Sequence, residues 1–89
     1  MLRIVTTGKF DKEYLLMYRR GKNLSKLETI MLMLAEEKQL PVQHRDHPLK
    51  GNFKGRRDCH IEPDWILIYK YAAGTVIFER TGSHADLFE

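Results

Sequence analysis

Three of the four histidines in this chain lie in short patches of its second half, each beside turn residues or an expected strand. They are His47, then His60 two residues after Asp58, then His84. Histidine has an unperturbed pKa near neutrality, so its imidazole can give and take protons at physiological pH. Several histidines on one small basic protein therefore raise the possibility of acid–base chemistry on an anion.

The composition describes one globular domain over residues 1–89. The chain is 43% hydrophobic and 30% charged, which allows a single modest core and one active site. Its one cysteine, Cys59, cannot form an internal disulfide. The longest apolar runs, 30–35 and 65–69, are too short to cross a bilayer or to form the core of a signal peptide. The sequence therefore predicts a protein of the reducing cytoplasm.

The basic residues are unevenly spread. The net charge is only +3, but residues 1–26 carry seven basic and two acidic side chains, and residues 44–57 carry five and one. Such segregation suits a basic face for phosphates, yet solvated helix faces are also commonly basic. Charge alone therefore does not decide between a nucleic-acid surface and an ordinary solvated surface.

The first 40 residues predict one strand and two helices. A β-branched run over 2–7 fits a strand, which Gly8 ends. Apolar residues then recur at helical spacing in two stretches separated by Gly21: Phe10, Tyr14, Met17 and Tyr18, then Leu27, Ile30, Met31 and Leu34. Ser25 and Glu28 predict a capping box for the second helix, with Asn23 as the alternative N-cap and Pro41 as the end. Each helix has one apolar face, which we expect to pack against a sheet.

The second half predicts a long loop over 41–55 and then three strands over 56–61, 65–71 and 75–80. Short turns between the strands make them consecutive antiparallel hairpins. Residues 65–69 are apolar at both even and odd positions, so both faces of this strand should be covered. The strand is therefore expected at the centre of the sheet. The order β-α-α-β-β-β predicts an α+β fold, with the N-terminal strand and a helix pair packed on a twisted antiparallel sheet. The second sheet face is left for a site.

Strand geometry places part of the polar set together. Side chains at alternate positions share one face, so Arg56, Asp58 and His60 should project together, roughly 6–7 Å apart from one to the next. The alternative is that this row is only the solvent face of an edge strand. Cys59 points the other way and is expected to be a small buried hydrophobe.

Three runs carry a resemblance to a known family. They are DHPLKG at 46–51, RDCHIEPDWILIY at 57–69 and RTGSHADLF at 80–88. In this order and at this spacing they resemble the signature of YafQ-type toxins, a branch of the RelE superfamily of bacterial toxin–antitoxin systems. The likeness covers the C-terminal half in detail and the whole chain in element order and length.

The resemblance implies a RelE-like fold and an mRNA interferase, a ribosome-dependent endoribonuclease that cleaves mRNA in the decoding site. No metal or other cofactor is implied, since attack by the 2′-hydroxyl needs a base, an acid and cations around the phosphate. The implied partners are a cognate antitoxin that holds the toxin inactive, the ribosome and mRNA. The resemblance also allows the toxin–antitoxin complex to bind operator DNA through its antitoxin. No membrane partner is expected.

Carried over by residue, the functional positions of the family fall on His47, Asp58, His60, Asp64, His84 and Phe88. We expect His60 and His84 to be the central proton-transfer pair, with His47 as a second candidate. Which histidine is base and which acid is left open. The two aspartates would orient or tune imidazoles, and Phe88 would stack on a nucleotide, a contact that contributes about 1–3 kcal/mol per base. The expected RNA-binding cations are Lys50, Lys54, Arg56 and Arg80.

Each role has a structural alternative. Asp64 could cap the turn after Pro63, and Phe88 could simply pack on the sheet. His44 has no partner motif and is expected in solvent. Core or sheet-face positions are expected for three further aromatic residues, Trp65, Tyr69 and Tyr71.

Other functions are also open at this stage. A tetrahedral zinc site could be formed by His47, His60, His84 and an aspartate, although their spacing is unlike that of short zinc motifs. The chain could instead bind RNA or the ribosome without cutting, or resemble a superfamily relative that inhibits a topoisomerase. Convergence of the three histidines in the fold would favour the enzyme, and scattered histidines would remove most of the support for it.

Overall fold

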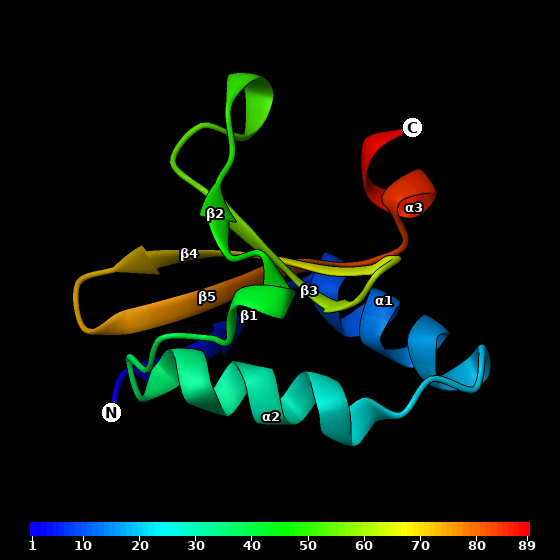
Figure 1. The fold of residues 1–89 in the computed structure, drawn as a ribbon, viewed down its shortest axis with the longest axis horizontal. Helices are drawn as coiled ribbons and strands as arrows, with labels where there is room; N and C mark the ends of the chain where they lie inside the picture. The colour runs from blue at the N-terminus through cyan, green and yellow to red at the C-terminus, as the bar shows by residue number, and fades with distance from the viewer.

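In a computed structural model that describes residues 1–89, five strands form one mixed sheet with two helices against one face (Figure 1). The elements are β1 (Arg3–Thr6), α1 (Gly8–Arg19), α2 (Leu24–Ala35), β2 (His47–Pro48), β3 (Arg57–Glu62), β4 (Trp65–Ala72), β5 (Thr75–Gly82) and α3 (His84–Phe88). Two short 3-10 helices, η1 (Val42–His44) and η2 (Gly51–Phe53), flank β2. The strand order is β1-β5-β4-β3-β2, so β4 lies at the centre, as its sequence predicts.

The α+β class and the element order are confirmed, but the sheet is not wholly antiparallel. The chain from β2 to β5 runs in antiparallel pairs, whereas β1 pairs with β5 in parallel. The β-branched pattern of a short strand suits either direction, and the direction of β1 follows from how the helix pair returns the chain to the sheet. The loop expected over 41–55 also contains the short strand β2 and both 3-10 helices.

The helix ends differ in detail from the prediction. Thr7 is the N-cap of α1 and accepts a hydrogen bond from the Phe10 N–H. For α2, Asn23 is the N-cap, so the capping box with Ser25 does not form. The α2 helix ends at Ala35, well before Pro41, and Glu37 follows in the left-handed region with a φ of 59°. The helical spacing of apolar residues therefore predicted that a helix forms here, but it did not predict where the helix ends.

The main core lies between the helices and the sheet. It contains 14 buried residues, among them Trp65, Tyr69 and Phe78, and it includes Cys59, as predicted. Burial raises the pKa of the Cys59 thiol. Tyr71, in contrast, is 47% exposed. None of the helices is long and apolar enough to cross a membrane.

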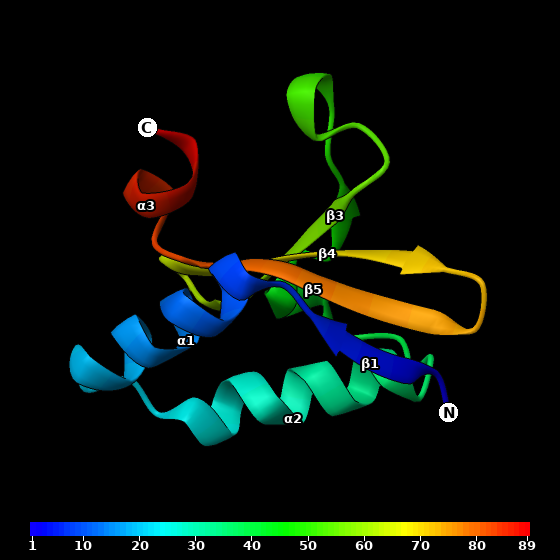
Figure 2. The ribbon, with the colours of Figure 1, turned by 180° about the vertical axis from the view of Figure 1, so that it is seen from behind.

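A second, smaller cluster lies on the opposite face of the sheet. Ile66, Ile68 and Leu87 are buried there, and the partly buried side chains of Leu49, Phe53 and Phe88 pack on them. Seen from either side, the β2–η2 segment and α3 rise from the sheet on the face away from α1 and α2 (Figure 2). We call this face, which carries β2, η2 and α3, the open face.

Candidate functional site

Two rows of paired residues cross the open face of the sheet. In the first, His47 on β2 lies opposite Asp58 on β3, and Asp58 lies opposite Ile68 on β4. In the second, His60 lies opposite Ile66. The first row continues to Arg80 on β5 and the second to Gly82, two residues before His84. Asp58 and His60 of the predicted polar row therefore lie on the same face as the residues carried by β2 and α3, whereas Arg56 precedes β3.

His47 and Asp58 are two predicted site residues whose side chains lie in contact. Nδ1 of His47 lies 3.1 Å from Oδ1 of Asp58, whose side chain is only 6% exposed. Burial raises the pKa of Asp58, while the charges of His47 and His60 act in the opposite direction. Oδ1 of Asp58 has no hydrogen bond with good geometry, because Nδ1 of His47 also faces the backbone oxygen of Arg45.

The hydrogen bonds of the histidine rings fix which nitrogen carries the proton. A carbonyl oxygen can only accept, so Nδ1 of His47 donates to Arg45, and Nδ1 of His60 donates to Pro63 over 3.1 Å. Neither Nε2 atom has a hydrogen-bond partner in the chain. A neutral imidazole held in this way presents Nε2 as a proton acceptor, and its protonated form presents Nε2 as a donor.

His84 begins α3 and is exposed. Its ring lies 5.1 Å from that of Phe88, centroid to centroid, and its Nδ1 lies 3.4 Å from Glu89. Its backbone N–H donates a 2.9 Å hydrogen bond to Oδ1 of Asp64. The Asp64 carboxylate therefore contacts the backbone of α3, and it forms no hydrogen bond with an imidazole or with the turn after Pro63.

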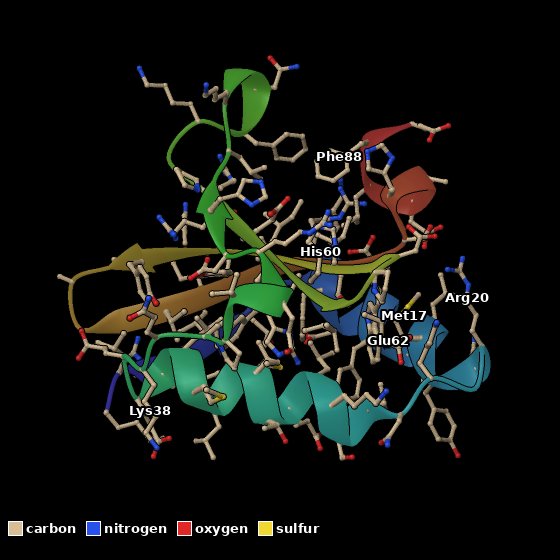
Figure 3. All side chains as sticks on the ribbon, viewed as in Figure 1. Met17, Arg20, Lys38, His60, Glu62 and Phe88 are labelled. Atoms are coloured by element: carbon tan, nitrogen blue, oxygen red, sulfur yellow. The ribbon has the colours of Figure 1, made fainter.

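Phe88 is half-buried above the sheet (Figure 3). Its ring packs edge-on against Phe53 of η2, with centroids 5.5 Å apart. Both rings belong to the small apolar cluster over Ile66 and Ile68. In the free protein Phe88 therefore packs on the sheet, as the structural alternative in the sequence analysis expects. The exposed ring of His84 lies beside it.

The predicted RNA-binding cations fall into two groups. Lys50 and Lys54 are exposed and form no ion pair. Arg56 and Arg80 are instead bound by carboxylates of the chain, Arg56 by Glu79 and Arg80 by Glu13. The sequence analysis missed both carboxylates, because they come from other elements of the fold.

His44 was expected in solvent, but it is half-buried and contacts β3. Its Nδ1 lies 2.6 Å from the backbone oxygen of His60, so it donates a hydrogen bond to that carbonyl. The bond fastens η1 to the strand that carries Asp58 and His60. No periodic signal in the loop sequence predicts this return to the sheet.

The three candidate histidines share a face but do not touch. Their ring nitrogens contact backbone oxygens, Asp58 or Glu89, and none forms a hydrogen bond with another imidazole. His60 and Gly82 lie on either side of Ile66 on β4. Because neighbouring strands are about 4.8 Å apart, the backbones of these two residues are about 10 Å apart. No group of three or more His, Cys, Asp or Glu side chains is placed to hold a metal ion, so the tetrahedral alternative has no assembled site.

Comparisons with known proteins relate this arrangement to one family. Residues 2–89 match the family described as the bacterial toxin of type II toxin–antitoxin systems, YafQ. The chain is 47% identical over 83 residues to the mRNA interferase toxin YafQ of Escherichia coli (strain K12), which covers 92% of this chain and 90% of that protein. The crystal structure of YafQ from E. coli strain BL21(DE3) matches with a TM-score of 0.94 at 43% identity, over all of both chains. The crystal structure of the E. coli DinJ–YafQ complex matches with a TM-score of 0.92 at 44% identity, again over all of both chains.

Proposed function

Because the chain belongs to the YafQ family of bacterial type II toxin–antitoxin toxins, we propose that it cleaves mRNA on the ribosome with histidines as proton donors and acceptors. The similarity to an mRNA interferase over most of both chains supports the activity. One geometric observation supports the chemistry. His47 and His60 lie on the open face with Nδ1 bound to a backbone oxygen, which orients each ring and leaves Nε2 available.

In the proposed reaction a neutral imidazole takes the proton of a ribose 2′-hydroxyl, and the 2′ oxygen attacks the adjacent phosphorus. The bond from phosphorus to the 5′ oxygen breaks, and its electron pair stays on that oxygen. An imidazolium then supplies the proton for the 5′-hydroxyl leaving group. The products are a 2′,3′-cyclic phosphate and a 5′-hydroxyl, so the step consumes neither water nor an oxidant.

His60 and His84 are the proposed pair, with His47 as a second candidate for either role. The separation of about 10 Å between the backbones of His60 and Gly82 leaves space for the reacting ribose and phosphate between histidines from β3 and α3. Asp58 lies opposite His47 and two residues before His60 on the same face of the sheet, where its carboxylate can orient the imidazole of His47. Asp64 acts through the position of α3.

Binding to RNA would use the exposed side of the same face. Lys50 and Lys54 flank η2 and are not neutralised by any carboxylate, so they can contact phosphates of mRNA or of the ribosome. Phe88 can stack on a nucleotide once its ring separates from Phe53.

The proposed partner in the cell is a cognate antitoxin, as DinJ is in the complex with E. coli YafQ. We place the protein in the cytoplasm, where its ribosome and mRNA partners are found. Operator DNA would be bound by the toxin–antitoxin complex through the antitoxin.

The decisive experiment is induction of the protein in bacteria with and without the neighbouring open reading frame, followed by primer extension on cellular mRNA. Growth arrest with cuts in the translated frame, relieved by the neighbouring product, is expected. Growth arrest without cuts would instead favour a non-cutting ribosome-binding module. Arrest with DNA damage would favour topoisomerase inhibition.

A further inference from the structure

Three polar side chains meet behind the sheet, on the face that the helices cover. Asp46 accepts a hydrogen bond from the hydroxyl of Tyr69 and another, over 3.3 Å, from Nε of Arg57. Both bonds end on the same carboxylate oxygen, Oδ1. We call these three residues the rear cluster. None of them takes part in the proposed reaction, yet Asp46 directly precedes His47 in the chain.

The chain passes from the helix side of the sheet to the open face between η1 and β2 (Figure 1). Gln43 of η1 lines a cavity together with Thr29 of α2, whereas β2 carries His47 on the open face. Successive side chains of an extended chain point to opposite faces, so Asp46 points behind the sheet and His47 points in front of it. A contact formed by Asp46 therefore reaches His47 through a single peptide bond.

Tyr69 gives Asp46 a partner whose position is fixed. The side chain of Tyr69 is fully buried in the main core, with its ring 6.4 Å from that of Phe78, centroid to centroid. Burial, together with the hydrogen bond to Asp46, raises the pKa of Tyr69, so its hydroxyl remains a proton donor. A buried hydroxyl without a partner is costly, so the bond favours the observed position of Asp46 over a position in solvent.

The backbone of Arg45 shows what this position of Asp46 holds in place. Arg45 lies in the left-handed region, with a φ of 48°, which is uncommon for a residue other than glycine. Such a conformation persists where the surrounding contacts determine it. On one side the N–H of Arg45 donates to the backbone oxygen of Val42 over 3.0 Å, and on the other the side chain of Asp46 is bound. The carbonyl between these two contacts accepts from Nδ1 of His47.

We propose that Tyr69 and Asp46 are positioning residues for His47 and act on it from behind the sheet. They fix the peptide unit between Arg45 and Asp46, whose carbonyl oxygen binds Nδ1 of His47 and thereby sets where Nε2 points. Arg57 adds a charged donor to the same oxygen of Asp46. The effect on cleavage rests on the function proposed above, whereas the position of the His47 ring can be measured without it.

The first test measures the position of His47 without any reaction. Tyr69→Phe removes only the hydroxyl and keeps the buried ring. The imidazole ¹⁵N signals of His47 should then shift, because Nδ1 loses its fixed partner, while those of His60 stay unchanged. The matched control is Tyr71→Phe, which removes the hydroxyl of the exposed neighbouring ring on the same strand. Unchanged His47 signals in Tyr69→Phe, or equal shifts of both histidines, would overturn the proposal.

The second test asks whether cleavage uses this position. Single-turnover cleavage on programmed ribosomes should slow about two- to tenfold in Tyr69→Phe, the range that corresponds to one hydrogen bond. The toxin concentration that gives half of the maximal rate should stay the same, because the rear cluster faces away from the side that would bind RNA. A change in that concentration alone, or full cleavage despite shifted His47 signals, would contradict the positioning role.

Asp46 supplies a second variant in case Tyr69→Phe does not fold, as judged by its amide NMR spectrum. Asp46→Ala removes the acceptor and should reproduce both effects, whereas Asp46→Asn keeps an oxygen for the Tyr69 hydroxyl and should restore most of the rate. Addition of Tyr69→Phe to Asp46→Ala should slow cleavage no further, because both changes remove the same contact. Additive losses would exclude a shared role. A wild-type protein that cuts no mRNA in primer extension would contradict the proposed function, and the NMR measurement would still test the position of His47.

Discussion

The backbone N–H of His84 donates a 2.9 Å hydrogen bond to Oδ1 of Asp64, which ties the turn between β3 and β4 to the first residue of α3. Ser83 and Asp86 form a capping box at the same helix start, and Asp86 also pairs with Arg20, the C-cap of α1. The position of the His84 side chain therefore depends on contacts from three parts of the fold.

We predict that Asp64→Ala lowers cleavage while Asp64→Asn largely preserves it. An asparagine side chain keeps an oxygen that accepts the His84 N–H, whereas alanine removes the acceptor. Loss of such a bond at a helix start costs about 0.5–2 kcal/mol. Cleavage by purified protein on programmed ribosomes and urea unfolding measure the two effects. Equal loss of cleavage in both variants would show that the charge of Asp64 matters more than its position.

Replacement of His60 or His84 by alanine should abolish toxicity and leave antitoxin binding intact. Loss of a general acid or base typically costs 10²–10⁴-fold in rate. His44→Gln is the matched control, because the side-chain hydrogen bond of His44 is to the backbone oxygen of His60 and His44 takes no part in the proposed chemistry. Growth on induction and single-turnover cleavage give the readout. A toxic His60→Ala or His84→Ala variant would remove that histidine from the mechanism.

Asp58 should make the folded protein less stable as the pH rises. Burial raises its pKa above that of the unfolded chain, so the folded state binds more protons between the two values. The stabilisation from this group is complete below the unfolded pKa, about 3.9, and is lost as the pH rises through the folded pKa. Asp58→Asn should remove this contribution, as urea unfolding from pH 4 to 8 can measure. An identical pH profile in the variant would contradict the raised pKa.

The proposed chemistry requires the ribose 2′-hydroxyl as the nucleophile. A 2′-deoxy substitution at the cut site should therefore stop cleavage, and EDTA should not, once ribosome integrity is controlled. The products should carry a 2′,3′-cyclic phosphate, detectable by mass spectrometry, and the rate should follow a bell-shaped pH profile. A metal-dependent hydrolase would activate water and tolerate the deoxy substitution. Normal cutting of the substituted codon would reject the mechanism.

The order of elements was predictable because periodicity reports local structure. Alternation placed Asp58 and His60 on one strand face, and apolar residues at both parities placed β4 at the centre of the sheet. The direction of β1 was not predictable, since a β-branched run pairs equally well in either direction. The early end of α2 depends on the left-handed residue Glu37, which the helical pattern does not mark.

The placement of candidate residues on one sheet face was predictable, and their contacts were less so. Arg80 and its partner Glu13 are 67 residues apart in the chain, and Arg56 and Glu79 are 23 residues apart. Such pairs depend on which elements become neighbours in three dimensions, and on the register shift that places Glu79. The role of Asp64 depends in the same way on where α3 begins.

The contact between Phe53 and Phe88 means that the free protein already covers part of the ring that we propose to stack on RNA. An edge-to-face aromatic pair contributes about 0.5–1.5 kcal/mol beyond burial, and an incoming base must replace that contact. Phe53 thus acts as an internal competitor, which would weaken stacking of RNA about two- to tenfold. Phe53→Ala should increase nucleotide affinity by that factor if no other contact is lost, and fluorescence anisotropy with a methylated RNA measures it. Weaker binding would instead make Phe53 a second stacking partner.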